Sequence, residues 1–183
     1  MAQFASSSTN AEVSGWLLHA TLYAEHTHKN KIKAVFAKQN IAHPEANKWY
    51  PWQSYLNALT ELSQLFGPTL LFSIGKHIAK NHPFALYANN LEMGLYNLNQ
   101  LHRYNHRGKG IGSYRLVNFS KERQEAKMEC RNAYPCYIDL GILTGLAQTL
   151  KPREASLIHV ELVSTLSSPT GAGNLSFYNV IWV

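Results

Sequence analysis

The chain has 183 residues, of which 45% are hydrophobic and 15% are charged. This composition excludes an intrinsically disordered chain and a solvated coiled coil, and the length suits one hydrophobic core. The longest apolar run, Thr69–Ile74, is far shorter than the roughly 20 residues of a membrane-spanning helix. The Ser-rich stretch Met1–Glu12 lacks the basic and apolar parts of a signal peptide. We therefore expect a flexible arm over 1–12, a single domain over 13–183 and a cytoplasmic location.

Lys and Arg outnumber Asp and Glu by 17 to 11, which gives a net charge of +6. The basic residues are scattered, and the densest stretches, His28–Lys33 and Arg103–Lys109, are too short to follow a phosphate backbone. This pattern argues against nucleic-acid binding. The two cysteines, Cys130 and Cys136, lack the second pair of ligands that a structural zinc site needs, so we expect reduced thiols and no zinc.

The first half of the chain is typical of helices. Apolar residues recur at spacings of three and four over 31–39, from a first turn at Pro51 to Leu65, over 68–80 and over 84–104. Each of these ranges is predicted to be helical. The apolar segment 13–23 fits either a strand or a helix, and the sequence alone leaves both open.

The second half is typical of strands around one helix. Gly108, Gly110 and Gly112 predict a turn-rich loop over 105–112 rather than a phosphate-binding loop, because no strand-to-helix context surrounds them. Alternating patterns predict strands over 113–119, 126–131, 156–163 and 175–183, with a helix over 138–150 and a loop over 167–174. This order predicts an α+β fold, with a helical layer packed on a four-stranded antiparallel sheet.

Several phrases carry a resemblance to a known family. They are Asn105-His106-Arg107-Gly108 with Ile111-Gly112-Ser113-Tyr114, Tyr134-Pro135-Cys136, the run Asp139–Leu146, a last strand ending in Trp182, and, earlier, Trp49-Tyr50-Pro51 and Ile74-Gly75-Lys76. With these phrases, residues 13–183 resemble bacterial small-molecule-binding domains of the 4-vinyl-reductase type. That family shares its fold with haem-based nitric-oxide-binding domains and with TRAPP vesicle-tethering subunits.

The resemblance implies an apolar pocket between helices and sheet that holds a small molecule or a cofactor. Metal-bearing members have cysteines near the last hairpin, where this chain has none over 164–174, so the resemblance implies no zinc either. Haem-binding relatives need an axial histidine and a Tyr-x-Ser-x-Arg phrase. His102 falls near the axial position, but 130–134 reads Cys-Arg-Asn-Ala-Tyr. The cofactor is unknown, and haem is an open alternative with His102 as its metal ligand.

We expect ten side chains to line the ligand site: Trp49, Tyr50, Trp52, Tyr55, Leu98, His102, Tyr114, Cys130, Tyr134 and Cys136. Each has an alternative structural role. His102 could instead be a buried structural histidine that is hydrogen-bonded to a backbone carbonyl. His106, four residues later, is expected in the loop. The cysteines fit buried structural thiols better than nucleophiles, since no triad partner stands out. No catalytic residue is assigned.

Four functional hypotheses follow. The first is a cytosolic, homodimeric sensory domain that binds an apolar small molecule, catalyses nothing and signals through a separate protein. The alternatives are a haem-based gas sensor with His102 as axial ligand, a small reductase-like enzyme that uses Cys130 or Cys136, and an interaction module whose interior only completes the fold.

Overall fold

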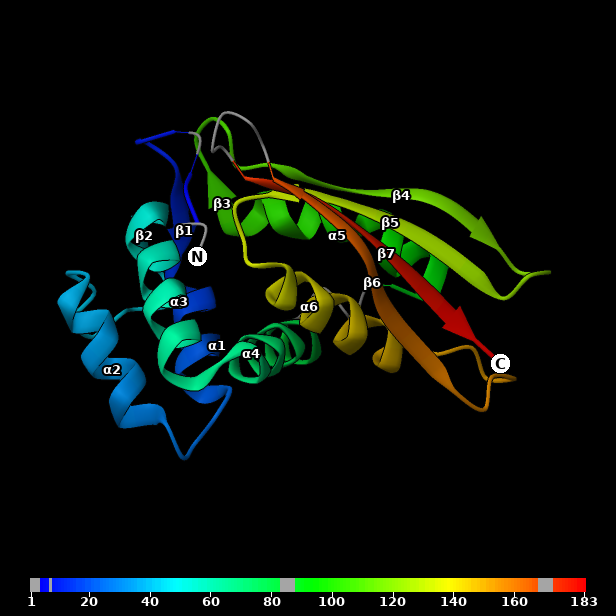
Figure 1. Cartoon of the computed structure of the whole chain (residues 1–183), viewed down its shortest axis with the longest axis horizontal. Helices are drawn as coiled ribbons and strands as arrows, with labels where there is room; N and C mark the ends of the chain where they lie inside the picture. Colours follow the sequence, from blue (N-terminus) through cyan, green and yellow to red (C-terminus); the bar gives the residue numbers. More distant parts are fainter. Residues whose placement is uncertain (1–3, 7, 83–87, 168–172) are drawn as a thin grey trace.

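A helical group and a curved sheet make up the molecule, and α6 (Cys136–Thr149) lies along one face of the sheet (Figure 1). The computed structural model describes residues 4–6, 8–82, 88–167 and 173–183. The helices of the first half gather at one end of the molecule and are α1 (Gly15–Tyr23), α2 (Lys29–Lys38), α3 (Trp52–Phe66) and α4 (Pro68–Asn81). A fifth helix, α5 (Leu91–Asn105), packs on the edge of the sheet.

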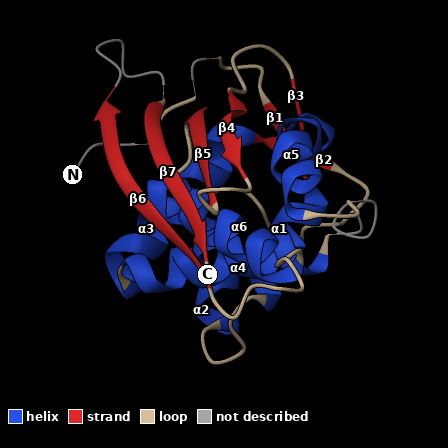
Figure 2. Ribbon diagram, turned by 90° about the vertical axis from the view of Figure 1, so that its right-hand side faces the viewer, coloured by secondary structure: helices blue, strands red, loops and turns tan. Residues whose placement is uncertain are grey.

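The main sheet confirms the predicted fold class. Its antiparallel strands are β4 (Ser113–Ser120), β5 (Glu125–Asn132), β6 (Ile158–Ser167) and β7 (Asn174–Trp182), in the spatial order β4-β5-β7-β6 (Figure 2). β5 shows why these residues form strands, since Ala126, Met128 and Cys130 are buried on one face while Lys127 and Arg131 are exposed.

Helices α4 and α6 touch backbone to backbone. A Cβ atom on Gly75 would lie 2.1 Å from the Ile138 carbonyl oxygen, and one on Gly141 would lie 2.2 Å from the Phe72 oxygen. Only glycine allows this approach. Two of the phrases behind the family resemblance, around Gly75 and Gly141, therefore form the contact that sets α6 under the sheet.

A second, small sheet was not expected. Its strands are β1 (Glu12–Ser14), β2 (Trp49–Pro51) and β3 (His106–Arg107), in the order β2-β1-β3. Segment 13–23 therefore begins as a strand and continues as α1. The predicted first turn at Pro51 is wrong, because Pro51 ends β2 and α3 begins at Trp52. The predicted loop over 105–112 is wrong at β3, where backbone pairing with β1 replaces a free turn.

The predicted helix over 84–104 is also too long. Residues 84–87 lie outside the described ranges, and α5 begins at Leu91, where the Asn90 side chain accepts a hydrogen bond from the Met93 amide as an N-cap. The predicted loop over 167–174 lies largely outside the described residues, while β6 reaches Ser167 and β7 begins at Asn174.

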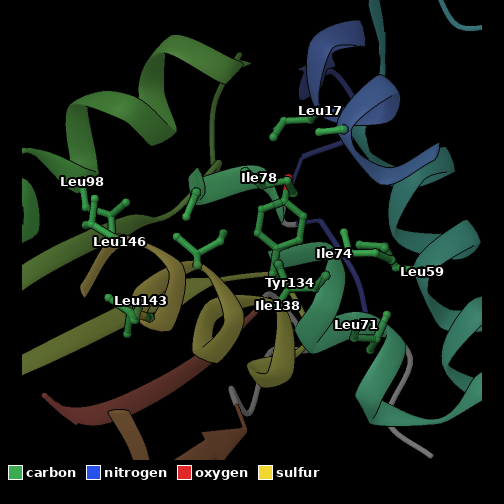
Figure 3. Packing of buried hydrophobic residues seen from close by; sticks show 14 of the residues in the cluster. Leu17, Leu59, Leu71, Ile74, Ile78, Leu98, Tyr134, Ile138, Leu143 and Leu146 are labelled. Atoms are coloured by element: carbon green, nitrogen blue, oxygen red, sulfur yellow. The ribbon is translucent and has the colours of Figure 1, made fainter. Parts of the chain in front are cut away.

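One hydrophobic core joins the helices to the sheet. Figure 3 shows Tyr134 among Ile74, Ile78 and Ile138, so α4 and α6 enclose its ring. Ala11 is buried and belongs to this core, and Glu12 pairs in β1. Packing therefore begins before residue 13, and flexibility of the arm stays a prediction. Within the described ranges no helix has the length and apolar character to cross a membrane.

Candidate functional site: a closed interior and an open groove

Four rings from different elements meet inside the molecule. The Trp52 ring on α3 lies 5.1 Å from the His106 ring, 5.6 Å from Tyr134 and 6.3 Å from His102, all edge to face. The two imidazoles lie 4.1 Å apart. We call Trp52, His102, His106 and Tyr134 the interior cluster. Three of its members are among the expected ligand-site residues.

Hydrogen bonds fix the protonation of both histidines. His102 Nε2 lies 2.7 Å from the Ile111 carbonyl oxygen, so this nitrogen carries the proton and donates. His106 Nδ1 donates to the His102 carbonyl at 2.8 Å, so its Nε2 accepts from the Tyr134 hydroxyl at 2.6 Å. Burial lowers the pKa of His102 to about 4 and that of His106 well below its ordinary value. Both rings are neutral, and His102 has the carbonyl partner that its structural role predicted.

A buried carboxyl group extends this polar interior. The Tyr114 hydroxyl donates to Asp139 Oδ1 at 2.5 Å, and the Asn132 amide donates to both carboxyl oxygens at 3.2 and 3.3 Å. Burial raises the pKa of Asp139 to about 7, although both hydrogen bonds oppose the rise. The Tyr114 ring lies 5.2 Å from His102 and links this carboxyl group to the interior cluster.

Very little empty space remains in this interior. A cavity of about 30 Å³ lies between α5, α6 and Tyr134, with Leu98, His102 and Tyr114 on its wall. This is room for one or two water molecules. Among the buried side-chain nitrogens and oxygens of the described residues, Trp52 Nε1 alone has no hydrogen-bond partner.

The remaining expected site residues lie apart from that cavity. The buried Tyr55 hydroxyl bonds Thr21 Oγ1 at 2.6 Å. Cys130 is buried on β5, and Cys136 is half-buried at the start of α6. Trp49 and Tyr50 lie on β2 outside the interior cluster. The Tyr50 hydroxyl accepts a hydrogen bond from the Glu45 backbone amide. The Arg107 guanidinium lies 4.5 Å above the centre of the Trp49 ring.

An open groove lies on the other side of α5. Its volume is about 700 Å³, and we call it the aromatic groove after Trp16, Trp49 and Tyr104, which line it with His82. The Trp16 and His82 rings meet edge to face at 4.5 Å, and the His82 and Tyr104 rings at 6.1 Å. The aromatic groove takes one residue, Trp49, from the expected site.

Leu101 and Asn105 line both the aromatic groove and the interior cavity, so they form the wall between the two. The Asn105 side chain accepts from Ser14 Oγ at 2.8 Å and donates to the Leu101 carbonyl at 3.1 Å and to His82 Nε2 at 3.2 Å. Both polar atoms of the Asn105 amide are therefore hydrogen-bonded within the protein, and these bonds hold the side chain in place between the groove and the interior cavity.

Sequence reasoning missed several of these residues. It placed His106 in a loop and gave no role to Asp139, Trp16, His82 or Tyr104. Asp139 carries the one signal that was available, because it is the only charged residue of α6. The groove residues come from four separate elements, and nothing in their spacing connects them.

Similar structures identify the fold. A scan against family models and a search of curated proteins found no match. A mutant T. tengcongensis H-NOX superposes with a TM-score of 0.67 at 12% identity, covering 91% of this chain and 95% of its own. An oxygen-binding H-NOX domain related to soluble guanylate cyclases superposes with a TM-score of 0.64 at 14% identity. The match covers 92% of this chain and 91% of that domain. A third structure, from work on haem redox potential and protein-induced porphyrin distortion, superposes with a TM-score of 0.64 at 13% identity. The match covers 92% of this chain and 99% of that one.

These similarities show that the chain has the H-NOX fold, and they match the haem-based branch of the resemblance. The branches to 4-vinyl-reductase-type domains and TRAPP subunits rest on the sequence phrases alone.

The side chains of this interior do not fit haem. A cavity of about 30 Å³ is far below the roughly 300–1,000 Å³ of small-molecule sites, and a porphyrin needs a volume in that range. His102 Nε2 is engaged by the Ile111 carbonyl. Arg131 points to solvent, and no buried Arg or Lys occurs in the described part of the chain to face the propionates.

Proposed function

We propose that this chain is a sensory domain that binds a small molecule in the aromatic groove and does so without haem. One observation carries the proposal: the aromatic groove offers about 700 Å³ beside three large aromatic side chains, whereas the interior offers about 30 Å³. The H-NOX fold supports the ligand-binding class. It also favours the haem alternative over a generic apolar ligand, but the filled interior weighs against haem in this chain.

The chemistry of the buried groups supports binding rather than reaction. Burial raises the pKa of the Cys130 and Cys136 thiols, so both stay protonated at neutral pH and are weak nucleophiles. Asp139 is hydrogen-bonded to Tyr114 and Asn132 and does not line the aromatic groove. The reductase-like hypothesis therefore gains no support. A homodimer and a separate signalling protein stay predictions.

Native mass spectrometry of the purified protein, followed by thermal unfolding with a library of small molecules, tests the proposal. Tyr104→Ala is the test variant and Tyr96→Ala its matched control. Both tyrosines lie on α5 and are 75% and 69% exposed, but only Tyr104 lines the aromatic groove. We expect a ligand that raises the unfolding temperature of wild type and Tyr96→Ala and has a smaller effect on Tyr104→Ala. Equal shifts in both variants would place the ligand elsewhere.

Titration with hemin tests the exclusion of haem directly. We expect no stoichiometric Soret band in the wild type. A band that forms at one equivalent and disappears in His102→Ala would overturn the proposal in favour of the haem alternative.

A further inference from the structure

We infer that the aromatic groove binds an uncharged, planar aromatic molecule that carries hydrogen-bonding groups on its edge. This inference rests on the proposed function and adds the chemical class of the ligand. It is built from the rings, the charges and the amides that surround the groove.

The rings supply flat apolar contact. Trp16, His82 and Tyr104 come from α1, the end of α4 and α5, and their edge-to-face contacts make one continuous aromatic lining. Trp49 adds a ring from β2. Aromatic rings gain most from partners that stack flat or meet edge to face, so the lining favours a planar ligand over an aliphatic one of the same size.

The charged groups near the aromatic groove each have a partner of opposite charge. Lys48, the only charged residue on its described lining, bonds Glu45 at 2.6 Å. Arg107, above the Trp49 ring, bonds Glu12 at 2.6 Å. Burial lowers the pKa of His82 to about 4, so its ring is neutral. An anionic ligand would have to compete with Glu45 for Lys48 and with Glu12 for Arg107, whereas an uncharged ligand would not.

Two side-chain amides on the lining, Asn47 and Gln100, are exposed, and neither is hydrogen-bonded to another described residue. Each offers a carbonyl acceptor and an NH₂ donor. The Asn105 amide, by contrast, is fully used in the wall. Polar atoms on the rim of a planar ligand can therefore bond Asn47 and Gln100 without breaking the wall.

Isothermal titration calorimetry with three probes of similar size tests the class. The probes are 2-quinolone (planar, neutral, with an amide edge), 2-naphthoate (planar, anionic) and cyclohexanecarboxamide (neutral, not planar). We expect 2-quinolone to bind the wild type at least tenfold more tightly than either of the others. Equal or tighter binding of 2-naphthoate or cyclohexanecarboxamide would overturn the inference.

Two substitutions at one position separate ring stacking from general apolar contact. Tyr104→Phe keeps the ring, whereas Tyr104→Leu keeps an apolar side chain without it, and the exposure of Tyr104 makes both harmless to the fold. We expect Tyr104→Phe to bind 2-quinolone within twofold of wild type and Tyr104→Leu to lose fivefold or more. Equal affinities in the two variants would contradict the inference.

The two proposals fail in different ways. If a library compound binds in a Tyr104-sensitive manner but is aliphatic or charged, the inference on ligand class is wrong and the proposed function stands. If nothing binds the aromatic groove in native mass spectrometry, thermal unfolding or calorimetry, both are wrong.

Discussion

The interior cluster and the aromatic groove contain the same kinds of side chain, but the first is closely packed and the second is open. Inside, Trp52, His102, His106 and Tyr134 pack ring against ring around about 30 Å³ of space. On the other side of the wall, tryptophan, histidine and tyrosine rings surround about 700 Å³. The hydroxyl and imidazole N–H groups of the interior cluster find partners within the protein, whereas the side chains of Asn47 and Gln100 in the groove bond no other described residue.

The difference shows that side chains, rather than the course of the backbone, decide where empty space is left. Helix α5 of this chain carries a buried histidine, His102, beside the sheet. In this chain His102 bonds the Ile111 carbonyl and lines a cavity of only about 30 Å³, whereas the aromatic groove on the other side of α5 offers about 700 Å³. Function follows from local side chains rather than from the arrangement of helices and strands.

The largest expected effect comes from comparing one tyrosine in each region. Tyr134→Ala empties a fully packed site and leaves the His106 Nε2 atom without its donor, so we expect a loss of about 3–5 kcal/mol in the free energy of unfolding. Tyr104→Ala, at 75% exposure, should change it by less than about 0.5 kcal/mol. Urea unfolding of both variants measures the contrast, and similar losses would mean that the two regions do not differ as described.

The interior should also dominate the pH dependence of stability. Burial raises the pKa of Asp139 from 3.8 to about 7, so between these values the folded protein holds a proton that the unfolded chain releases. Stability from this group is therefore full below about pH 4 and falls as pH rises to 7, by up to about 4 kcal/mol. His102, with its pKa lowered from 6.5 to about 4, has the opposite effect: its contribution to the free energy of unfolding rises as pH increases from 4 to 6.5.

The variant Asp139→Asn separates these two effects, since it removes the carboxyl group and keeps the histidines. We expect the variant to gain stability relative to wild type steadily from pH 4 to pH 8. Urea unfolding at unit pH steps measures this difference. Parallel profiles for the two proteins would show that Asp139 ionises normally.

The contact between α4 and α6 holds the interior closed and should not tolerate a side chain. Gly141→Ala would place a Cβ atom 2.2 Å from the Phe72 carbonyl oxygen, so we expect a loss of about 1–3 kcal/mol. Gln148→Ala, an exposed change on the same helix, is the control and should be nearly neutral. Thermal or urea unfolding distinguishes the two, and a neutral Gly141→Ala would mean that the helices can separate at little cost.

The sequence predicted the main sheet and most helices because these elements are eight residues long or more, which leaves room for a periodic pattern. β1, β2 and β3, of two or three residues each, are too short to show a period, so the small sheet was missed. His106 is buried where it pairs with Val13, which is 93 positions away in the sequence. A local sequence pattern cannot predict a contact at that separation. The phrases around Gly75 and Gly141 were visible, but their role needs the knowledge that α4 and α6 cross.

The smallest expected effect tests the wall that divides the two regions. Ser14→Ala removes the hydroxyl that donates to Asn105 Oδ1 at 2.8 Å and leaves a buried acceptor unpaired, at a cost of about 1 kcal/mol. Asn105 keeps its bonds to Leu101 and His82, so the fold should persist. Because Ser14 also lines the aromatic groove, the loosened wall should weaken 2-quinolone binding about twofold while Tyr96→Ala leaves it unchanged. Unaltered stability and binding in Ser14→Ala would show that the Ser14 hydroxyl does not help to hold Asn105 in the wall.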